Sequence, residues 1–303
     1  MFVGLMRWTQ ARRRYRDMKR RLAKLDRLDR RGDAPTRIAT PWRRRWPLRD
    51  KVIVVVSCLA TAAVLVFIRV TNSGWADPAV YTYPALPPDA ADTRILPPVI
   101  DAPTGAHAFL MTMADGRPVT YDPCRPLHYV VNSTGMPPGG LELVRSAVQE
   151  ISAASGLAFI EDGGTLESLV EVRSQRQPRR YGDRWAPVLI GWVDAAKFPL
   201  VSGDIAGVGG SSMAAPEGPG SERYVSGQVS LSRDFFTAAV ARPGGDAIAR
   251  AVVMHELGHL VGLAHVRDPG ELMTESNLGI TTFGAGDRQG LAAVGAGRCH
   301  TDT

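Results

Sequence analysis

The chain has few cysteines, only three among 303 residues. Small secreted proteins that are held together by disulfides contain many more, so this architecture is excluded. No internal repeat is visible along the sequence either. Hydrophobic residues make up 45% of the chain. This content and length are sufficient for one or two domains, each with a buried core.

Positive charge is scarce outside the first 51 residues. Residues 1–51 contain 18 Lys and Arg against 5 Asp and Glu, whereas residues 52–303 contain 18 against 25. The formal net charge of +6 is therefore an average of a basic tail and an acidic remainder. No folded basic surface is expected to accompany the tail, so we predict no nucleic-acid partner.

One segment lacks charge altogether. Residues 52–68, VIVVVSCLATAAVLVFI, lie between Lys51 and Arg69. A helix that crosses the ~30 Å hydrocarbon core needs about 20 apolar residues, and this run is at the short end of that range. We predict a transmembrane signal anchor over residues 52–69. The excess of Lys and Arg before it places the N-terminus in the cytoplasm and the rest of the chain outside.

Two questions about this N-terminal region remain open from the sequence. A cleavable signal peptide would need a basic region of 51 residues before its apolar run, far longer than usual, so we favour an uncleaved anchor. The tail itself fits two interpretations. Tyr15, Met18 and Leu22 recur at helical spacing, which is typical of an amphipathic helix on anionic lipid, but a solvated, disordered arm explains the composition equally well.

The rest of the chain divides into a stalk and a domain. Residues 70–104 are rich in proline and lack periodicity, which predicts a stiff, extended stalk. Residues 105–303 have the length of a single domain. Their order of one strand, a helix, several strands and then helices predicts an α+β fold. The expected strands cover residues 127–132, 157–160, 169–172, 188–193 and 224–231, and the expected helices cover 141–155, 247–261 and 287–294.

The strongest signal for chemistry is the segment HELGHLVGLAH. His255 and His259 are four residues apart on a predicted helix, so both imidazoles project from one face and can share a metal ion. Glu256 is adjacent to the first of them and can reach a water bound to that metal. Gly262 allows the helix to end and the chain to reverse, which brings His265 round as a third ligand. Three imidazoles and one open position predict a catalytic Zn2+ site.

This segment resembles the metzincin zinc-peptidase signature, H-E-x-x-H-x-x-G-x-x-H followed by a methionine turn. The segment H-V-R-D-P-G-E-L-M is similar to the matrixin branch of this family, and the specific match covers residues 255–273. The resemblance implies zinc bound by His255, His259 and His265, Glu256 as general base on a zinc-bound water, and Met273 as an apolar floor beneath the ligands. It implies a mixed twisted sheet, an active-site helix and a C-terminal helix, here behind one transmembrane helix.

The function that follows is a zinc metalloendopeptidase that hydrolyses peptide bonds of extracytoplasmic proteins or peptides. Several departures leave its substrate preference open. Val266 stands where matrixins usually have serine, and Glu275 stands where astacin-like and serralysin-like relatives often have tyrosine. The proline-x-tyrosine wall of the matrixin pocket is also absent. Residues 224–231 are either an edge strand that pairs with an extended peptide or an interior strand.

The cysteines outside the apolar run form an even pair, Cys124 and Cys299. In an oxidising compartment such a pair predicts one disulfide. The alternative is that Cys124 caps the zinc, as a propeptide cysteine does in latent matrixins, although the flanking DPCRPL is only faintly similar to that switch. Calcium has no motif to support it, since no D-x-[DN]-x-[DN]-G loop is present.

Two other functions compete with the peptidase. One is a catalytically silent, zinc-stabilised binding domain on a membrane anchor, although a structural zinc site would not need the carboxylate of Glu256. The other is a membrane regulator that acts through residues 1–51, for which no signalling motif is present. The expected partners are a protein or peptide substrate and the membrane, through the anchor and, in one interpretation, through contact of residues 1–51 with anionic lipid. The natural substrate stays open.

Overall fold

The computed structural model describes residues 83–203, 205–216, 218–275 and 279–301. The predicted tail over residues 1–51, the predicted anchor over residues 52–69 and the first part of the predicted stalk lie outside these residues. Among the described residues, no helix is both long and apolar enough to cross a membrane.

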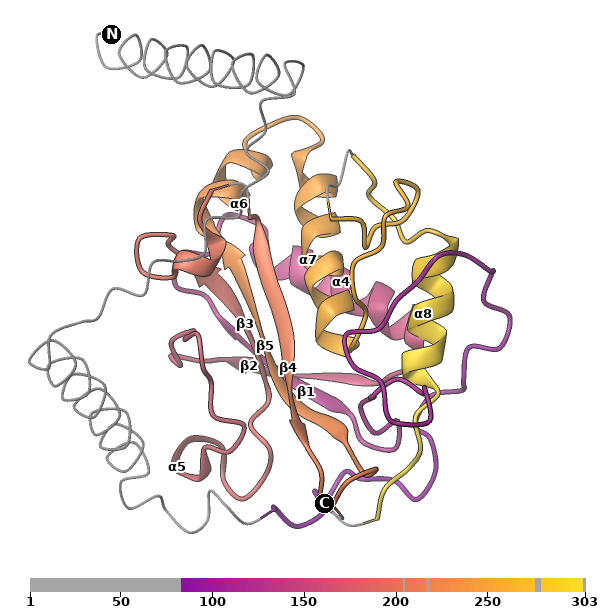
Figure 1. Ribbon diagram of the computed structural model, residues 1–303. Coiled ribbons are helices and arrows are strands. Elements are labelled where there is room, and N and C mark those ends of the chain that lie inside the picture. The colour runs from indigo at the N-terminus through magenta and orange to yellow at the C-terminus, as the bar shows by residue number, and fades with distance from the viewer. Residues whose placement is uncertain (1–82, 204, 217, 276–278, 302–303) are drawn as a thin grey trace, which may run out of the picture. The chain divides into compact units, whose positions relative to one another are not determined.

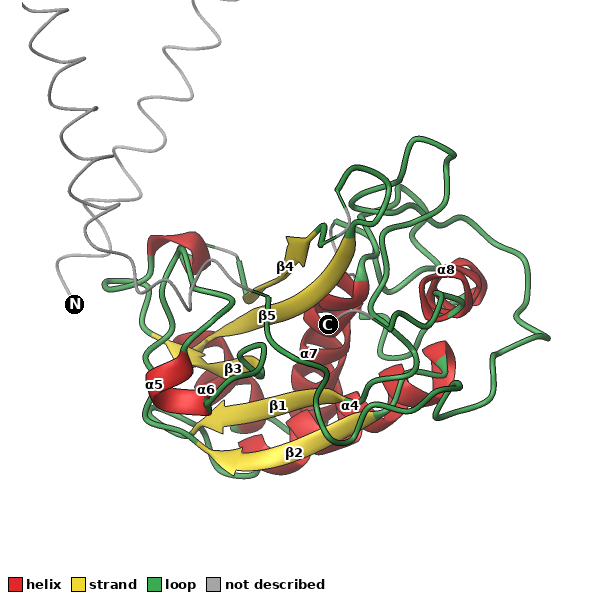
Figure 2. Ribbon diagram, turned by 90° about the horizontal axis from the view of Figure 1, so that it is seen from below, coloured by secondary structure: helices red, strands yellow, loops and turns green. Residues whose placement is uncertain are grey.

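A five-stranded sheet forms the centre of the described domain, in the order β2-β1-β3-β5-β4. Figure 2 shows this order across the sheet. Strands β2, β1, β3 and β5 run parallel to one another, and β4 runs antiparallel to β5. The strand bounds are β1 Leu127–Asn132, β2 Phe159–Gly164, β3 Val188–Val193, β4 Gly207–Ala214 and β5 Arg223–Ser232.

Helices cover one side of this sheet. In Figure 1, α4, α7 and α8 gather on that side, and α5 lies on the other. The helix bounds are α4 Gly140–Ser155, α5 Pro178–Tyr181, α6 Arg233–Val240, α7 Gly245–Val261 and α8 Ala285–Gly295, with a short 3-10 turn at Pro199–Val201. The core lies between α4, α7 and the sheet, where Ile151, Ile190 and Leu257 are fully buried.

The sequence explains how these elements form. The six residues of β3, VLIGWV, are almost continuously apolar, as expected for an interior strand of a parallel sheet. Val144, Val148 and Ile151 recur on the buried face of α4. Helix α7 ends at Gly262, whose φ of 118° strongly favours glycine. The chain can therefore reverse at that residue, as the sequence predicted.

The predicted fold class, an α+β domain behind one transmembrane helix, is wrong. The described residues form a mixed α/β domain, and none of their helices can span a membrane. Helix α4 connects β1 to its neighbour β2 as a crossover, which returns the chain in the same direction and makes the pair parallel. The linear order of strands and helices did not reveal this pairing, because pairing is decided by tertiary contacts.

Two segments differ from their predicted secondary structure. Residues 169–172 form no strand, and the glycine-rich run from Gly207, which is not among the expected strands, forms β4. Its glycines allow the strand to lie directly against α7. A Cβ added at Gly209 would lie 2.1 Å from the carbonyl oxygen of Glu256. Glycine in this strand thus reflects a close approach of two backbones rather than a flexible loop.

The last part of the predicted stalk contacts the domain. The Ala91 N–H donates to the Cys124 carbonyl at 2.8 Å, and the Arg94 guanidinium donates to the Gly295 carbonyl at 2.7 Å. Cys124 and Cys299 are joined in a disulfide, with their Cα atoms 5.3 Å apart. This disulfide ties the segment before β1 to the segment after α8.

Candidate metal centre

Three histidine side chains converge at one point of the domain. Nε2 of His265 lies 3.0 Å from Nε2 of His255 and 3.0 Å from Nε2 of His259. His255 and His259 lie one turn apart on α7, and His265 comes from the loop that follows Gly262. These are the three ligands that the motif predicted, and the structure brings them together.

Backbone carbonyls fix the orientation of two of these rings. Nδ1 of His255 donates to the Leu272 carbonyl at 2.8 Å, and Nδ1 of His259 donates to the Leu263 carbonyl at 2.8 Å. A carbonyl oxygen only accepts hydrogen bonds, so the hydrogen of each neutral ring is on Nδ1 and the lone pair is on Nε2. Hydrogen bonds of this kind commonly orient the imidazoles that bind metals.

The arrangement of the three Nε2 atoms is explained better by a shared metal ion than by hydrogen bonds among the rings. His265 can give a ring hydrogen to only one of the other two Nε2 atoms, so at least one pair of lone pairs faces without a proton between. Nitrogen ligands at 2.0–2.1 Å from a tetrahedral zinc ion are separated by about 3.3 Å. The observed separations of 3.0 Å are close to that spacing. A cation at the common point would remove the repulsion.

Burial keeps the ligand set neutral. Burial lowers the pKa of His255. It is also the main cause that lowers the pKa of His259 to about 4, and the neighbouring imidazoles act in the same direction. Burial also lowers the pKa of His265, although the negative charge of Glu275 opposes this shift. Metal ions bind the neutral imidazole, so these environments favour the form that coordinates.

Glu256 lies beside the three histidines and lines the same cleft. The residue is only 6% exposed, and this burial raises the pKa of its carboxyl to about 8. A hydrogen bond from the Gly209 N–H acts in the opposite direction and lowers the pKa. Gly207 packs against the same side chain, since a Cβ added there would lie 2.7 Å from Glu256 Cγ. Two glycines of β4 thus make room for this carboxylate and orient it.

Met273 is buried against α7. Its residue is 1% exposed, and its Sδ lies 2.5 Å from the place that a Cβ on Gly258 would occupy. Gly258 is the residue before His259, so the thioether lies against the turn of α7 that carries the histidine ligands. Any larger residue at position 258 would displace the methionine.

Two buried carboxylates that sequence reasoning missed hold this methionine turn in place. Asp287 accepts hydrogen bonds from the backbone N–H groups of Leu272 at 2.5 Å and of Met273 at 3.2 Å. Glu271 accepts from the N–H groups of Gly286 at 2.8 Å and of Asp287 at 2.9 Å, at the start of α8. Burial raises the pKa of Asp287, and the charge of Glu271 adds to this effect. Since the Leu272 carbonyl accepts from His255, the pair indirectly supports a predicted metal ligand.

The metal centre opens into a cleft of about 750 Å³. Gly207 and Gly209 of β4 line one wall, and His255, His259 and Val252 of α7 line another. Among the described residues, β4 pairs only with β5 in the sheet, so it is an edge strand, and the N–H of its Gly209 already donates to Glu256. Residues 224–231, left open between edge and interior, lie in the interior strand β5, and the strand next to the cleft is β4.

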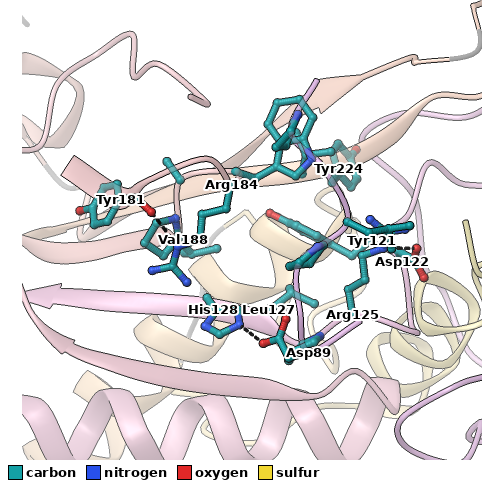
Figure 3. Close-up of a pocket in the computed structure, with 18 of the residues that line it drawn as sticks. Asp89, Tyr121, Asp122, Arg125, Leu127, His128, Tyr181, Arg184, Val188 and Tyr224 are labelled. Atoms are coloured by element: carbon teal, nitrogen blue, oxygen red, sulfur yellow. Dashed lines mark hydrogen bonds and ion pairs between the residues drawn. The ribbon is translucent and has the colours of Figure 1, made fainter. Parts of the chain in front are cut away.

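A second cavity, of about 440 Å³, lies where β1, β3 and β5 begin (Figure 3). No motif in the sequence predicts it. Ion pairs surround its apolar lining. His128 lies between Asp89 at 2.6 Å and Asp162 at 2.7 Å, and Figure 3 shows the first of these contacts. None of the predicted ligands lines this cavity.

The structure separates the remaining predicted residues from the metal centre. Cys124 is bonded to Cys299, so in this state its thiol is not available to cap a metal.

No family model matches this chain, and no curated protein matches its sequence. The chemistry of the site therefore has to be argued from its geometry.

Proposed function

We propose that this protein is a zinc-dependent endopeptidase that hydrolyses peptide bonds of extracytoplasmic proteins or peptides. One observation carries the proposal: three imidazole Nε2 atoms converge next to the Glu256 carboxylate in an open cleft. The site needs all of these parts together. A binding domain stabilised by zinc would not require the carboxylate or the opening.

The donor set favours zinc in a catalytic role. His255, His259 and His265 are nitrogen ligands, which zinc prefers, and three protein ligands leave a fourth position open. A structural zinc site is usually closed by a fourth protein ligand, and among the described residues no further His, Cys, Asp or Glu groups with these three. When bound there, zinc supplies a Lewis acid and lowers the pKa of a coordinated water towards ~7.

The protein groups supply the remaining chemistry. Glu256 accepts a proton from the attacking water and returns it to the leaving amine, which makes it the general base and then the general acid. The Gly209 N–H orients this carboxylate, so that it does not have to be ordered during the reaction. The carbonyls of Leu272 and Leu263 hold two metal ligands in a fixed orientation.

As an edge strand, β4 provides a means of holding a substrate through backbone groups other than the Gly209 N–H, which binds Glu256. An extended peptide can add to an exposed sheet edge through backbone hydrogen bonds, which need no particular side chain. Such a peptide would pass along the wall formed by Gly207 and Gly209, beside the metal centre. This arrangement suits unfolded segments and linear peptides better than compact folded proteins.

The disulfide supports an extracytoplasmic location. A stable bond between Cys124 and Cys299 forms and persists in an oxidising compartment, whereas cytoplasmic thiols are kept reduced. We therefore place the proposed activity outside the cytoplasm.

The test compares the full-length chain with its Glu256→Gln variant, each loaded with zinc. The glutamine keeps the shape of the side chain and removes the base. Both proteins are incubated with an unfolded protein and a mixed peptide library, with and without a chelator, and the cut sites are identified by mass spectrometry. We expect cleavage by the wild type that the chelator abolishes, and a loss of about 100-fold or more in the variant.

Zinc content is measured on the same samples. If both proteins hold one zinc ion per chain and neither cuts any substrate, the endopeptidase proposal is refuted, and a zinc-stabilised binding domain accounts for the site. If the two proteins cut equally well, Glu256 is not the general base.

A further inference from the structure

The cleft contains a second carboxylate, which the proposed chemistry does not use. Glu275 follows the methionine turn, is exposed, and lines the same cavity as the three histidines. It makes no hydrogen bond or ion pair with any residue that the structure describes. By contrast, the carboxylate of Glu256 is buried and held by β4.

The walls around Glu275 offer it no counter-charge. The described residues that line the cleft include no lysine or arginine, and much of the lining is apolar, as at Leu110, Ile205, Phe235 and Val252. Most exposed carboxylates face open water, where their interactions are weak. A carboxylate inside a partly enclosed, apolar cleft is screened less and interacts more strongly with a charged ligand.

Glu275 also lies close to the reacting centre. Glu275 and His265 line the same cleft. The backbones of Val266 and Thr274 form a bridge next to both residues, which keeps the two segments adjacent. A substrate residue beside the cleaved bond would therefore pass within the influence of this carboxylate.

We propose that Glu275 selects substrates that carry a cationic group beside the bond to be cleaved. This inference rests on the proposed peptidase function and adds the substrate class to it. The group is an ammonium or guanidinium, supplied either by a lysine or arginine side chain or by a free amino terminus. An acidic substrate residue at this position would instead face a like charge and be rejected.

The charge of the part of the chain after residue 51 acts in the same direction, whereas the basic residues 1–51 bring the net charge of the whole chain to +6. Residues 52–303 carry 25 Asp and Glu against 18 Lys and Arg. Negative charge on this part of the chain favours the approach of cationic peptides to it at low ionic strength. Glu275 would supply the local selection, and the remaining acidic residues would add a weaker attraction that salt screens.

The experiment uses peptides of one sequence with lysine, arginine, glutamine or glutamate on either side of the cleaved bond. Each peptide is made with a free and with an acetylated amino terminus, which separates the two sources of positive charge. The full-length chain is compared with Glu275→Gln and Glu275→Lys. Glu142→Gln serves as a matched control, because it removes one negative charge from the exposed surface of α4.

For the wild type and the Glu142→Gln control, we expect kcat/KM to be about tenfold higher for the lysine peptide than for the glutamate peptide. Glu275→Gln should bring the two peptides within about twofold of each other, and Glu275→Lys should reverse the preference. The effect should lie mainly in KM, and zinc content should not change, because the contact is with substrate rather than with the metal.

Binding provides a second readout that does not need turnover. Labelled peptides are titrated into Glu256→Gln, with and without the Glu275→Gln change, and Kd is measured by fluorescence anisotropy. Equal affinity for the lysine and glutamate peptides, or a preference that survives Glu275→Gln, would overturn the inference. So would loss of zinc from Glu275→Gln, which would mean that the residue supports the metal. If the wild type binds with the expected preference but cuts nothing, the peptidase proposal alone has failed.

Discussion

Replacement of Asp287 by asparagine should weaken both the fold and the metal centre. Oδ2 of Asp287 accepts from the Leu272 N–H at 2.5 Å and from the Gly284 N–H at 2.9 Å, and Oδ1 accepts from the Met273 N–H. An asparagine has one oxygen and one NH2 group in these places. Whichever way the amide turns, its NH2 group faces at least one backbone N–H, and that donor loses its acceptor.

The magnitude follows from burial. Asp287 is 1% exposed, so the N–H groups it leaves cannot turn to water without opening the methionine turn. Each unsatisfied buried donor costs about 1–3 kcal/mol. One or two such groups give a loss of about 1–6 kcal/mol in the free energy of unfolding. In a domain of this size, such a loss lowers Tm by roughly 2–24 °C.

The metal centre should respond in the same variant. The methionine turn carries the Leu272 carbonyl that orients His255, and loss of such a supporting contact typically lowers metal affinity about 10- to 100-fold. Thermal unfolding of the metal-free protein and zinc competition against a chromophoric chelator measure the two effects separately. Asp246→Asn is the control, because Asp246 is exposed in the first turn of α7. If Asp287→Asn matches this control in both assays, the supporting role of Asp287 is refuted.

Three further predictions test other contacts. Gly209→Ala should displace β4 from α7, because the added Cβ would meet the Glu256 carbonyl. We expect a loss of about 1–3 kcal/mol in the free energy of urea unfolding, together with loss of cleavage. Gly210→Ala is the control and should be nearly neutral, because a Cβ there has no neighbour within 4 Å. Hydrogen bonds to the Glu167 carboxylate lower the pKa of this residue, although burial opposes the shift. Ionised Glu167 therefore stabilises the fold above the pKa of about 4.5 that it has in the unfolded chain, and this stabilisation is lost as the pH falls. Glu167→Gln should therefore flatten the acid side of the stability curve, and an unchanged curve would contradict this. Cys124→Ser should lower the free energy of unfolding by about 2–5 kcal/mol, with no further loss on reduction, and a variant as stable as the wild type would contradict the structural role of the disulfide.

The ligand set could be predicted from the sequence because its geometry is local. His255 and His259 lie one helical turn apart, and Gly262 lies where the helix must end before the chain returns to His265. These relationships follow from helix geometry and from the conformational freedom of glycine. Met273 came only from the resemblance, since nothing in its own neighbourhood predicts contact with α7.

The supporting groups could not be predicted, because they act across long separations. Asp287 contacts the methionine turn from 14 and 15 residues away, and in the sequence it is an ordinary acidic residue at the start of a helix. The role of β4 was hidden for a different reason. Its glycine-rich sequence does not predict a strand, and only the packing shows that Gly209 lies in contact with Glu256.

The sheet order also depends on tertiary contacts. The sequence indicated three of the five strands closely, at residues 127–132, 188–193 and 224–231. It did not show that β1 lies between β2 and β3, or that β5 is interior and β4 is an edge strand. That assignment decides which strand can hold a substrate, so the access route to the site came from the structure alone.

The central claim is most directly tested by the rate at which new amino termini appear when an unfolded protein is incubated with zinc-loaded wild type or with Glu256→Gln at equal zinc content. We expect one zinc ion per chain in both proteins, bound through His255, His259 and His265, and a rate at least about 100-fold lower in the variant. Equal rates, or one bound zinc ion with no cleavage by either protein, would contradict it.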